Sequence, residues 1–253
     1  LLVDAGALAG ALWAVRVAAR PPTARWTFGL KRAEILAAAA NGVTLAVVGA
    51  VLAVEAIQRL VHPEHVRGGA MIVVACAGVA VNLAAAAVLA RGSGRSINVR
   101  AAYLHVLTDL FGLLATGIAG AVILSTGWDR ADPIASLAVV AVVLVAAWRL
   151  LRTSGRVLLE GTPEAVDLDE VRRHLEELDD VVAVHDLHAW VVTSDLPAVT
   201  AHVVVTDVCL AQGSAGQLLD RIQACLSGHF DVVHSTFQIE ALSHLDHEEG
   251  LHE

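Results

Sequence analysis

The sequence has 253 residues, of which 56% are hydrophobic and 17% charged, a composition too apolar for an ordinary soluble domain. Its net charge of −9 is uneven: residues 1–159 hold 14 Lys and Arg against 7 Asp and Glu, whereas residues 160–253 hold 3 against 19. Nine of the twelve His also follow residue 160. These numbers predict a membrane domain over residues 1–159 and an acidic, His-rich domain over residues 160–253. The three Cys have no framework spacing, so no disulfide is predicted.

Apolar segments long enough to cross a bilayer recur along the first domain. Residues 35–54 and 68–90 carry no charge, and each is close to the ~20 residues that a membrane helix needs. The sequence opens in apolar residues without a charged leader, so we expect a sixth span upstream of the five within it. The predicted spans are about 1–19, 33–58, 68–90, 98–127 and 132–152.

The distribution of basic residues predicts the orientation of these spans. If the spans alternate in direction, eleven Lys and Arg of the first domain fall on one side and three on the other. Basic loops remain in the cytoplasm, so the residues that follow the last span are expected there too.

The ionisable side chains Asp4, His105 and Asp109 fall in the apolar parts of predicted spans. His105 and Asp109 are four residues apart and share one face of a helix. A carboxylate at membrane depth is costly unless it is paired, protonated or bound to a cation, and imidazole with carboxylate suits a divalent transition metal. The alternative is a polar pair that only holds helices together. Asn41, in the second span, is either an outer-shell partner of such a site or an interhelical hydrogen-bonding group.

The second domain shows the periodicity of a small α+β layer structure. A capping pattern at residues 167–170 opens a helix, strands are predicted over residues 181–192 and 199–205, a helix over 217–226 and a third strand over 232–239. The order α-β-β-α-β belongs to the α+β class. We expect the tail after Ala241 to be frayed, and we interpret His174 and His229 as ordinary surface residues.

Segments spread over nearly the whole chain give it a family resemblance. They are Leu2-Val3-Asp4, Arg20-Pro21-Pro22, Phe28 to Leu36, Asn98 to Asp109, Ala131-Asp132-Pro133, His185-Asp186-Leu187-His188-Ala189-Trp190, Ala201-His202-Val203 and His234 to Glu240. In this order they resemble the cation diffusion facilitators, the zinc-type divalent-metal/proton antiporters. The resemblance implies an α-helical polytopic membrane domain with a cytoplasmic ferredoxin-like domain, assembled as a homodimer in a membrane such as the bacterial inner membrane.

The resemblance also implies the site residues. Asp4, His105 and Asp109 match the family's transport-site ligands, and a further His ligand would precede Leu1. The residues His185, His202, His234 and Glu240 match positions that bind regulatory metal in some members, and His188 flanks them; the alternative is that these are surface or strand-packing side chains. Two features depart from many members: residues 91–95 form no long His-rich loop, and Trp26 stands where a His is common.

The implied function is export of Zn²⁺, or of Cd²⁺ and Co²⁺, from the cytoplasm in exchange for protons. Zinc would be both the transported substrate and a regulatory ligand, and no nucleic-acid partner or enzymatic activity is expected. Two alternatives remain: a membrane-tethered metal sensor, and an intramembrane metalloenzyme that uses the same His and Asp residues around an activated water.

Overall fold

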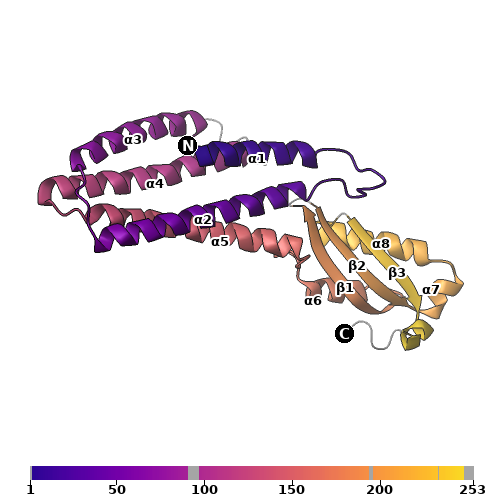
Figure 1. Cartoon of the computed structure of the whole chain (residues 1–253). Coiled ribbons are helices and arrows are strands. Elements are labelled where there is room, and N and C mark those ends of the chain that lie inside the picture. The colour runs from indigo at the N-terminus through magenta and orange to yellow at the C-terminus, as the bar shows by residue number, and fades with distance from the viewer. Residues whose placement is uncertain (1, 91–96, 194–195, 233, 248–253) are drawn as a thin grey trace. The chain divides into compact units, whose positions relative to one another are not determined.

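The computed structural model describes residues 2–90, 97–193, 196–232 and 234–247 (Figure 1). The short segment at 91–95, residues 194–195 between the first two predicted strands, and the end of the tail lie outside these ranges. The helices are α1 (Leu2–Ala18), α2 (Ala33–Val61), α3 (Gly68–Ala90), α4 (Ile97–Thr126), α5 (Ala131–Leu158), α6 (Leu168–Glu176), α7 (Asp207–Ala211) and α8 (Ala215–His229), and the strands are β1 (Val181–Thr193), β2 (Leu196–Val205) and β3 (His234–Ala241). A 3₁₀ helix, η1 (Leu242–His247), follows.

Four helices in the described residues are long and apolar enough to cross a membrane. They are α2, α4 over residues 109–126, α3 over residues 68–87, and α5, while α1 holds a shorter apolar stretch at residues 9–18. Large apolar side chains point outward from them: Val73, Ile118 and Leu124 expose 70%, 66% and 67% of their surface. Lipid is the environment in which such surfaces are stable. The predicted fold class, apolar helices followed by a small sheet domain, is confirmed.

The chain forms two compact units, residues 42–149 and residues 1–41 with 150–253. In the first unit, glycines bring α3 and α4 together along their length. A Cβ added at Gly68 would lie 2.6 Å from the carbonyl oxygen of Gly120, and one added at Gly78 would lie 2.6 Å from the Leu113 side chain. Small residues permit this close approach, on which helix association in lipid depends. The packing fixes α4, the helix that carries His105 and Asp109.

Ion pairs and hydrogen bonds tie the loops at one end of this unit. Arg59 of α2 donates to Asp132 of α5 across 2.8 Å, and the Asp129 carboxylate accepts from the backbone N–H of Val66 across 3.3 Å. The Asp132 side chain is 16% exposed. These contacts hold the start of α5 against the end of α2.

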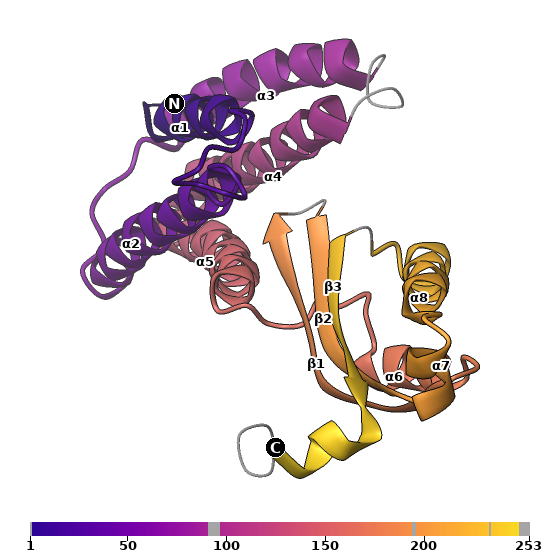
Figure 2. The ribbon, with the colours of Figure 1, turned by 90° about the vertical axis from the view of Figure 1, so that its right-hand side faces the viewer.

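The second unit contains the small α+β domain, in which two helices cover one face of a three-stranded sheet (Figure 2). Asp167 caps α6 as predicted, since its carboxylate accepts from the backbone N–H groups of Asp169 and Glu170. The buried faces of the helices pack on the sheet through Val171 and Leu175 of α6 and through Leu218, Ile222 and Leu226 of α8. The strand order is β1-β2-β3, with β1 and β2 antiparallel and β2 and β3 parallel.

A β-bulge in β1 changes which side chains share a face of the sheet. His185 pairs with His202 and His188 pairs with Thr200, so residues 186 and 187 together oppose a single residue of β2. Asp186 at the bulge has φ of +47°, in the left-handed region that non-glycine residues seldom adopt. The extra residue leaves His185 and His188 on the same face, although three positions separate them.

Several segment boundaries differ from the sequence prediction; α5, for example, continues to Leu158 rather than ending near residue 152. β2 begins at Leu196, not near residue 199, because Pro197 joins the ladder opposite Val191. A Pro is tolerated there because it lies next to the start of the strand. The tail was predicted to fray directly after Ala241, but Leu242–His247 forms η1, which packs against β2 and β3.

Candidate metal sites

The predicted transport-site residues lie on two membrane helices. Asp4 belongs to α1, and His105 and Asp109 stand one turn apart on α4, so the two α4 residues share a helix face. The Asp109 side chain is exposed in the described chain, whereas the side chains of Asp4 and His105 lie outside the described part of the structure. Convergence of the three on one cation remains a prediction.

Asn82 and Asn41, two amide side chains of the membrane helices, have different surroundings. Asn82 donates to the Gly78 carbonyl of its own helix across 3.0 Å, which satisfies it locally in a packing role. Asn41 is half-buried on α2. Its predicted role as an outer-shell partner of the transport site stays a prediction.

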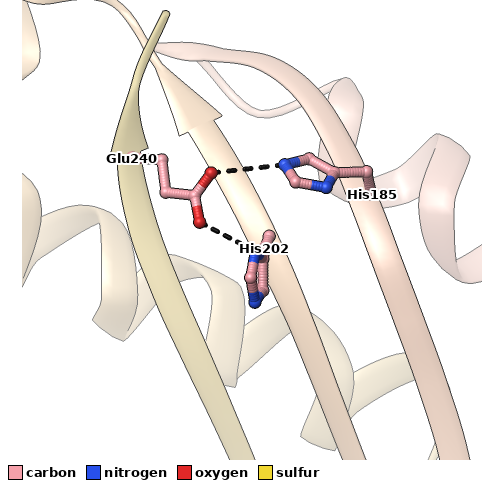
Figure 3. Close-up of side chains that lie close together, drawn as sticks. All are labelled: His185, His202 and Glu240. Atoms are coloured by element: carbon pink, nitrogen blue, oxygen red, sulfur yellow. Dashed lines mark hydrogen bonds and ion pairs between the residues drawn. The ribbon is translucent and has the colours of Figure 1, made fainter. Parts of the chain in front are cut away.

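Three of the predicted regulatory residues meet on the sheet face opposite the helices (Figure 3). His185 and His202 are paired across β1 and β2, and Glu240 comes from β3. The Glu240 carboxylate lies 3.3 Å from Nε2 of His185 and 2.8 Å from Nδ1 of His202, and the two imidazole rings are 5.1 Å apart, edge to face. One donor atom from each residue lies within 4.8 Å of the others. We call these three residues the sheet cluster.

The chemistry and spacing of the sheet cluster fit a zinc-type ion. Bonds of 2.0–2.2 Å to imidazole and carboxylate in a tetrahedral shell place donor atoms about 3.3 Å apart, close to the contacts observed. Glu240 is 4% exposed, and a carboxylate this buried needs a positive or hydrogen-bonding partner. Gln238 supplies one hydrogen bond, donated from Nε2 across 2.7 Å. Two imidazoles and one carboxylate leave one position of a tetrahedral shell open.

Asp186 is a functional candidate that sequence analysis missed. Its carboxylate lies 2.7 Å from Nε2 of His188 and 3.7 Å from Nε2 of His202, so it links the exposed His188 to the sheet cluster. Regular alternation places residues 185 and 186 on opposite faces. Only the bulge brings Asp186 to the same face, and the sequence carried no signal for the bulge.

His234, the remaining predicted regulatory residue, stands apart from the sheet cluster. It lies at the start of β3 opposite Ala198, six residues before Glu240, which corresponds to about 20 Å along a strand. Its ring instead contacts Phe28 edge-on, with centroids 5.5 Å apart. In the described residues the predicted five-residue set thus divides into a cluster of three, a linked His188 and a separate His234.

Comparison with known proteins gives matches to both halves of the chain. Residues 1–159 match the family described as the cation efflux transmembrane domain, and residues 163–242 match the cytoplasmic domain of cation efflux proteins. The chain belongs to the cation diffusion facilitator family. This cation efflux protein is therefore an integral membrane protein with a cytoplasmic C-terminal domain, and the sheet cluster lies within that domain.

Named relatives of this cation efflux protein are transporters. The zinc transporter ZitB of Escherichia coli is 42% identical over 242 residues, covering 95% of this chain and 76% of ZitB. The cadmium, cobalt and zinc/H⁺-K⁺ antiporter of Bacillus velezensis is 36% identical, covering 96% and 78%. The efflux protein CzcD of Cupriavidus metallidurans is 40% identical, covering 95% and 75%. The expectation that the chain is not an enzyme is confirmed, and the metalloenzyme alternative is set aside.

Among solved structures, the metal-bound C-terminal domain of the CzcD transporter is 33% identical to this chain. The match covers 30% of this chain and 99% of that domain, with a TM-score of 0.26.

Proposed function

We propose that this cation efflux protein exports Zn²⁺, and also Cd²⁺ and Co²⁺, from the cytoplasm across the bacterial inner membrane in exchange for protons. The observation that carries the proposal is similarity over 95% of the chain to relatives named for zinc transport. The His/Asp pair of α4, one turn apart in a largely apolar helix, supports a dication as the cargo.

In this proposal Asp4, His105 and Asp109 bind the ion within the membrane domain, residues 1–159. Two carboxylates neutralise the charge of the dication and so lower the cost of holding it at membrane depth. Once the metal leaves, the imidazole and the carboxylates accept protons, so the same groups carry both ions in turn. Asn41 would orient one of the ligands.

The sheet cluster supports a regulatory role for metal in the cytoplasmic domain, residues 160–253. This domain carries 19 acidic residues against 3 Arg, so two copies in a homodimer repel one another. Metal on the sheet cluster adds positive charge and cross-links all three strands. We propose that bound zinc reduces the repulsion and draws the two cytoplasmic domains of the dimer together.

Transport into proteoliposomes tests the proposal. Asp109→Ala in the full-length protein should abolish zinc uptake and the accompanying proton movement, because the dication loses one neutralising carboxylate, while the helix survives because Ala is a good helix former. Thr116→Ala is the matched control on the same helix, since Thr116 bonds only its own backbone at Gly112 in the described contacts, and it should transport normally.

Two outcomes would overturn the assignment. Uptake at the wild-type rate in Asp109→Ala would remove Asp109 from the site, and zinc uptake without proton movement would remove the antiport. Zinc binding without any uptake in wild-type vesicles would favour the membrane-tethered sensor, in which the sheet cluster is the active part.

A further inference from the structure

A cavity lies between the loop that joins α1 to α2 and the sheet of the cytoplasmic domain. Its volume is about 920 Å³, and its walls belong to one compact unit, residues 1–41 with 150–253. Residues 25–33 form one wall, and β1 contributes His188 and Trp190 to the other. We call it the loop cavity. Of the candidate metal ligands that the structure describes, only His188 lines it, so neither proposed metal site accounts for it.

Hydrogen bonds and packing contacts fix the conformation of the loop beside the domain. The backbone N–H groups of Thr23 and Trp26 each donate to the carbonyl oxygen of the other residue across 3.0 Å, which closes a tight turn. The Phe28 ring packs against β3, and Arg32 donates to Glu160 across 2.8 Å. The loop wall of the cavity is therefore folded within itself and held to the rest of the unit at two points.

The loop brings positive charge to the cavity. Residues 5–33 hold five Lys and Arg and no Asp or Glu. The charged side chains that line the cavity are Arg25, Lys31, Arg32 and Glu160. Glu160 neutralises Arg32, whereas Arg25 and Lys31 have no ion-pair partner in the part of the chain that the structure describes. Three cations against one carboxylate leave two positive charges, which attract an anion.

Large apolar side chains surround these cations. Trp26, Phe28 and Leu36 line the cavity and leave 53%, 44% and 57% of their surface exposed. A contiguous apolar surface of this kind indicates a binding site for an apolar partner. The loop joins two predicted spans and lies beside the cytoplasmic domain, so it stands where the bilayer meets the cytoplasm. Tryptophan and basic side chains are both enriched at that boundary.

We propose that the loop cavity binds one anionic phospholipid of the cytoplasmic leaflet. The lipid phosphate would lie between Arg25 and Lys31, and an acyl chain would cover Trp26 and Leu36. Basic pockets on the cytoplasmic side of membrane helices suit anionic headgroups, and the aromatic wall favours an amphiphile over a soluble anion. Because Trp190 lies on the opposite wall, the same lipid would bridge the loop and the cytoplasmic domain. The site is independent of the transported ion and of the sheet cluster.

Native mass spectrometry of the full-length protein in detergent tests the charged part of the site. The protein is titrated with phosphatidylglycerol or with phosphatidylcholine of the same acyl chains, and the wild type should bind one phosphatidylglycerol per chain more tightly than phosphatidylcholine. Arg25→Gln with Lys31→Gln should weaken phosphatidylglycerol binding about 30-fold, since each basic group near a lipid surface contributes about fivefold. The matched control, Arg149→Gln with Arg152→Gln, removes the same charge from exposed positions of α5 outside the cavity and should bind as the wild type does.

Trp26→Ala tests the apolar part of the site. The hydrogen bonds of Trp26 to Thr23 come from its backbone, so the turn persists while phosphatidylglycerol binding should weaken. Glycerol phosphate, a headgroup without acyl chains, should not displace the lipid. Equal affinities for the two lipids, equal losses in the two double variants, or displacement by glycerol phosphate would overturn the proposal. Unchanged phosphatidylglycerol affinity with loss of dimers in the Arg25/Lys31 variant would assign the cavity to a contact between two copies of the chain.

Discussion

Replacement of Glu240 by Gln is the sharpest test of the sheet cluster. The substitution keeps the size of the side chain and one oxygen, but it removes the negative charge and presents an amide to the imidazoles. In the structure the carboxylate lies 2.8 Å from His202 and 3.3 Å from His185 and is 4% exposed. Solvent therefore screens its charge little, and a bound dication depends strongly on it.

The expected loss follows from linkage. Removing an outer-shell partner of a metal site costs 10- to 100-fold in affinity. Glu240 would be a direct, buried ligand, so its replacement should cost at least as much as the upper end of that range. We therefore expect zinc binding to be at least about 100-fold weaker. Zinc at 100 times its Kd stabilises the wild type by about 2.7 kcal/mol. After a 100-fold loss the same concentration stabilises Glu240→Gln by only about 0.4 kcal/mol by the same relation.

Zinc affinity of the full-length protein in detergent, measured by competition with a chromophoric chelator at pH 7.5, checks this directly, with zinc-induced thermal stabilisation as a second readout. His234→Ala is the matched control, because His234 lies on the same sheet but apart from the cluster. Magnesium should stabilise neither protein, and zinc binding should weaken as the pH falls, because the neutral imidazole is the ligand. Equal zinc affinities in Glu240→Gln and His234→Ala would refute the sheet cluster as a metal site.

Three further predictions concern other parts of the chain. His105→Asp should shift transport from zinc toward manganese, because a hard oxygen replaces a nitrogen ligand, and an unchanged Zn/Mn transport ratio would contradict the proposed site. Gly68→Ala should destabilise the membrane domain by about 1–3 kcal/mol, since its Cβ would meet backbone atoms of α4. The control Gly69→Ala, with open space around the added Cβ, should not destabilise it. Thermal unfolding in detergent compares the two variants. In metal-free protein Cys225 should be alkylated slowly at neutral pH and faster as the pH rises, because its raised pKa keeps it a thiol. Glu177→Gln should speed the alkylation. Equal alkylation rates in the wild type and in Glu177→Gln would show that the carboxylate does not act on the thiol.

Local sequence patterns were sufficient to predict most of the helices and strands. Apolar length predicted α2 to α5, and the capping pattern at Asp167 predicted the start of α6, because both signals act within a few residues. They did not predict the bulge at Asp186, whose backbone conformation depends on packing against β2. They also did not bring His174 next to His229, since that contact depends on how two helices pack on a sheet.

The candidate metal ligands were likewise predicted in part, and their arrangement depends on the packing of the strands. Family resemblance indicated His185, His202 and Glu240, and the structure places them together: all three face away from the helices, His185 is paired with His202, and Glu240 lies two residues after Gln238, the partner of His202 on β3. It also indicated His234, which strand register places far from them. The sequence shows which candidate ligands are present, whereas the register between the strands decides which of them lie close together.

Because of the β1 bulge, the position of the sheet cluster depends on the packing of the apolar core on the other face of the sheet. Val184, Leu187 and Ala189 all face the helices and are 4% to 7% exposed, a spacing of three and then two that only a strand with one inserted residue can bury. Sliding β1 along β2 by one position would expose all three to water. The packing of apolar side chains on one face of the sheet therefore keeps His185 and His202 paired on the other face. A metal that bound to the sheet cluster would therefore meet side chains that are already aligned, and its loss would leave the domain folded.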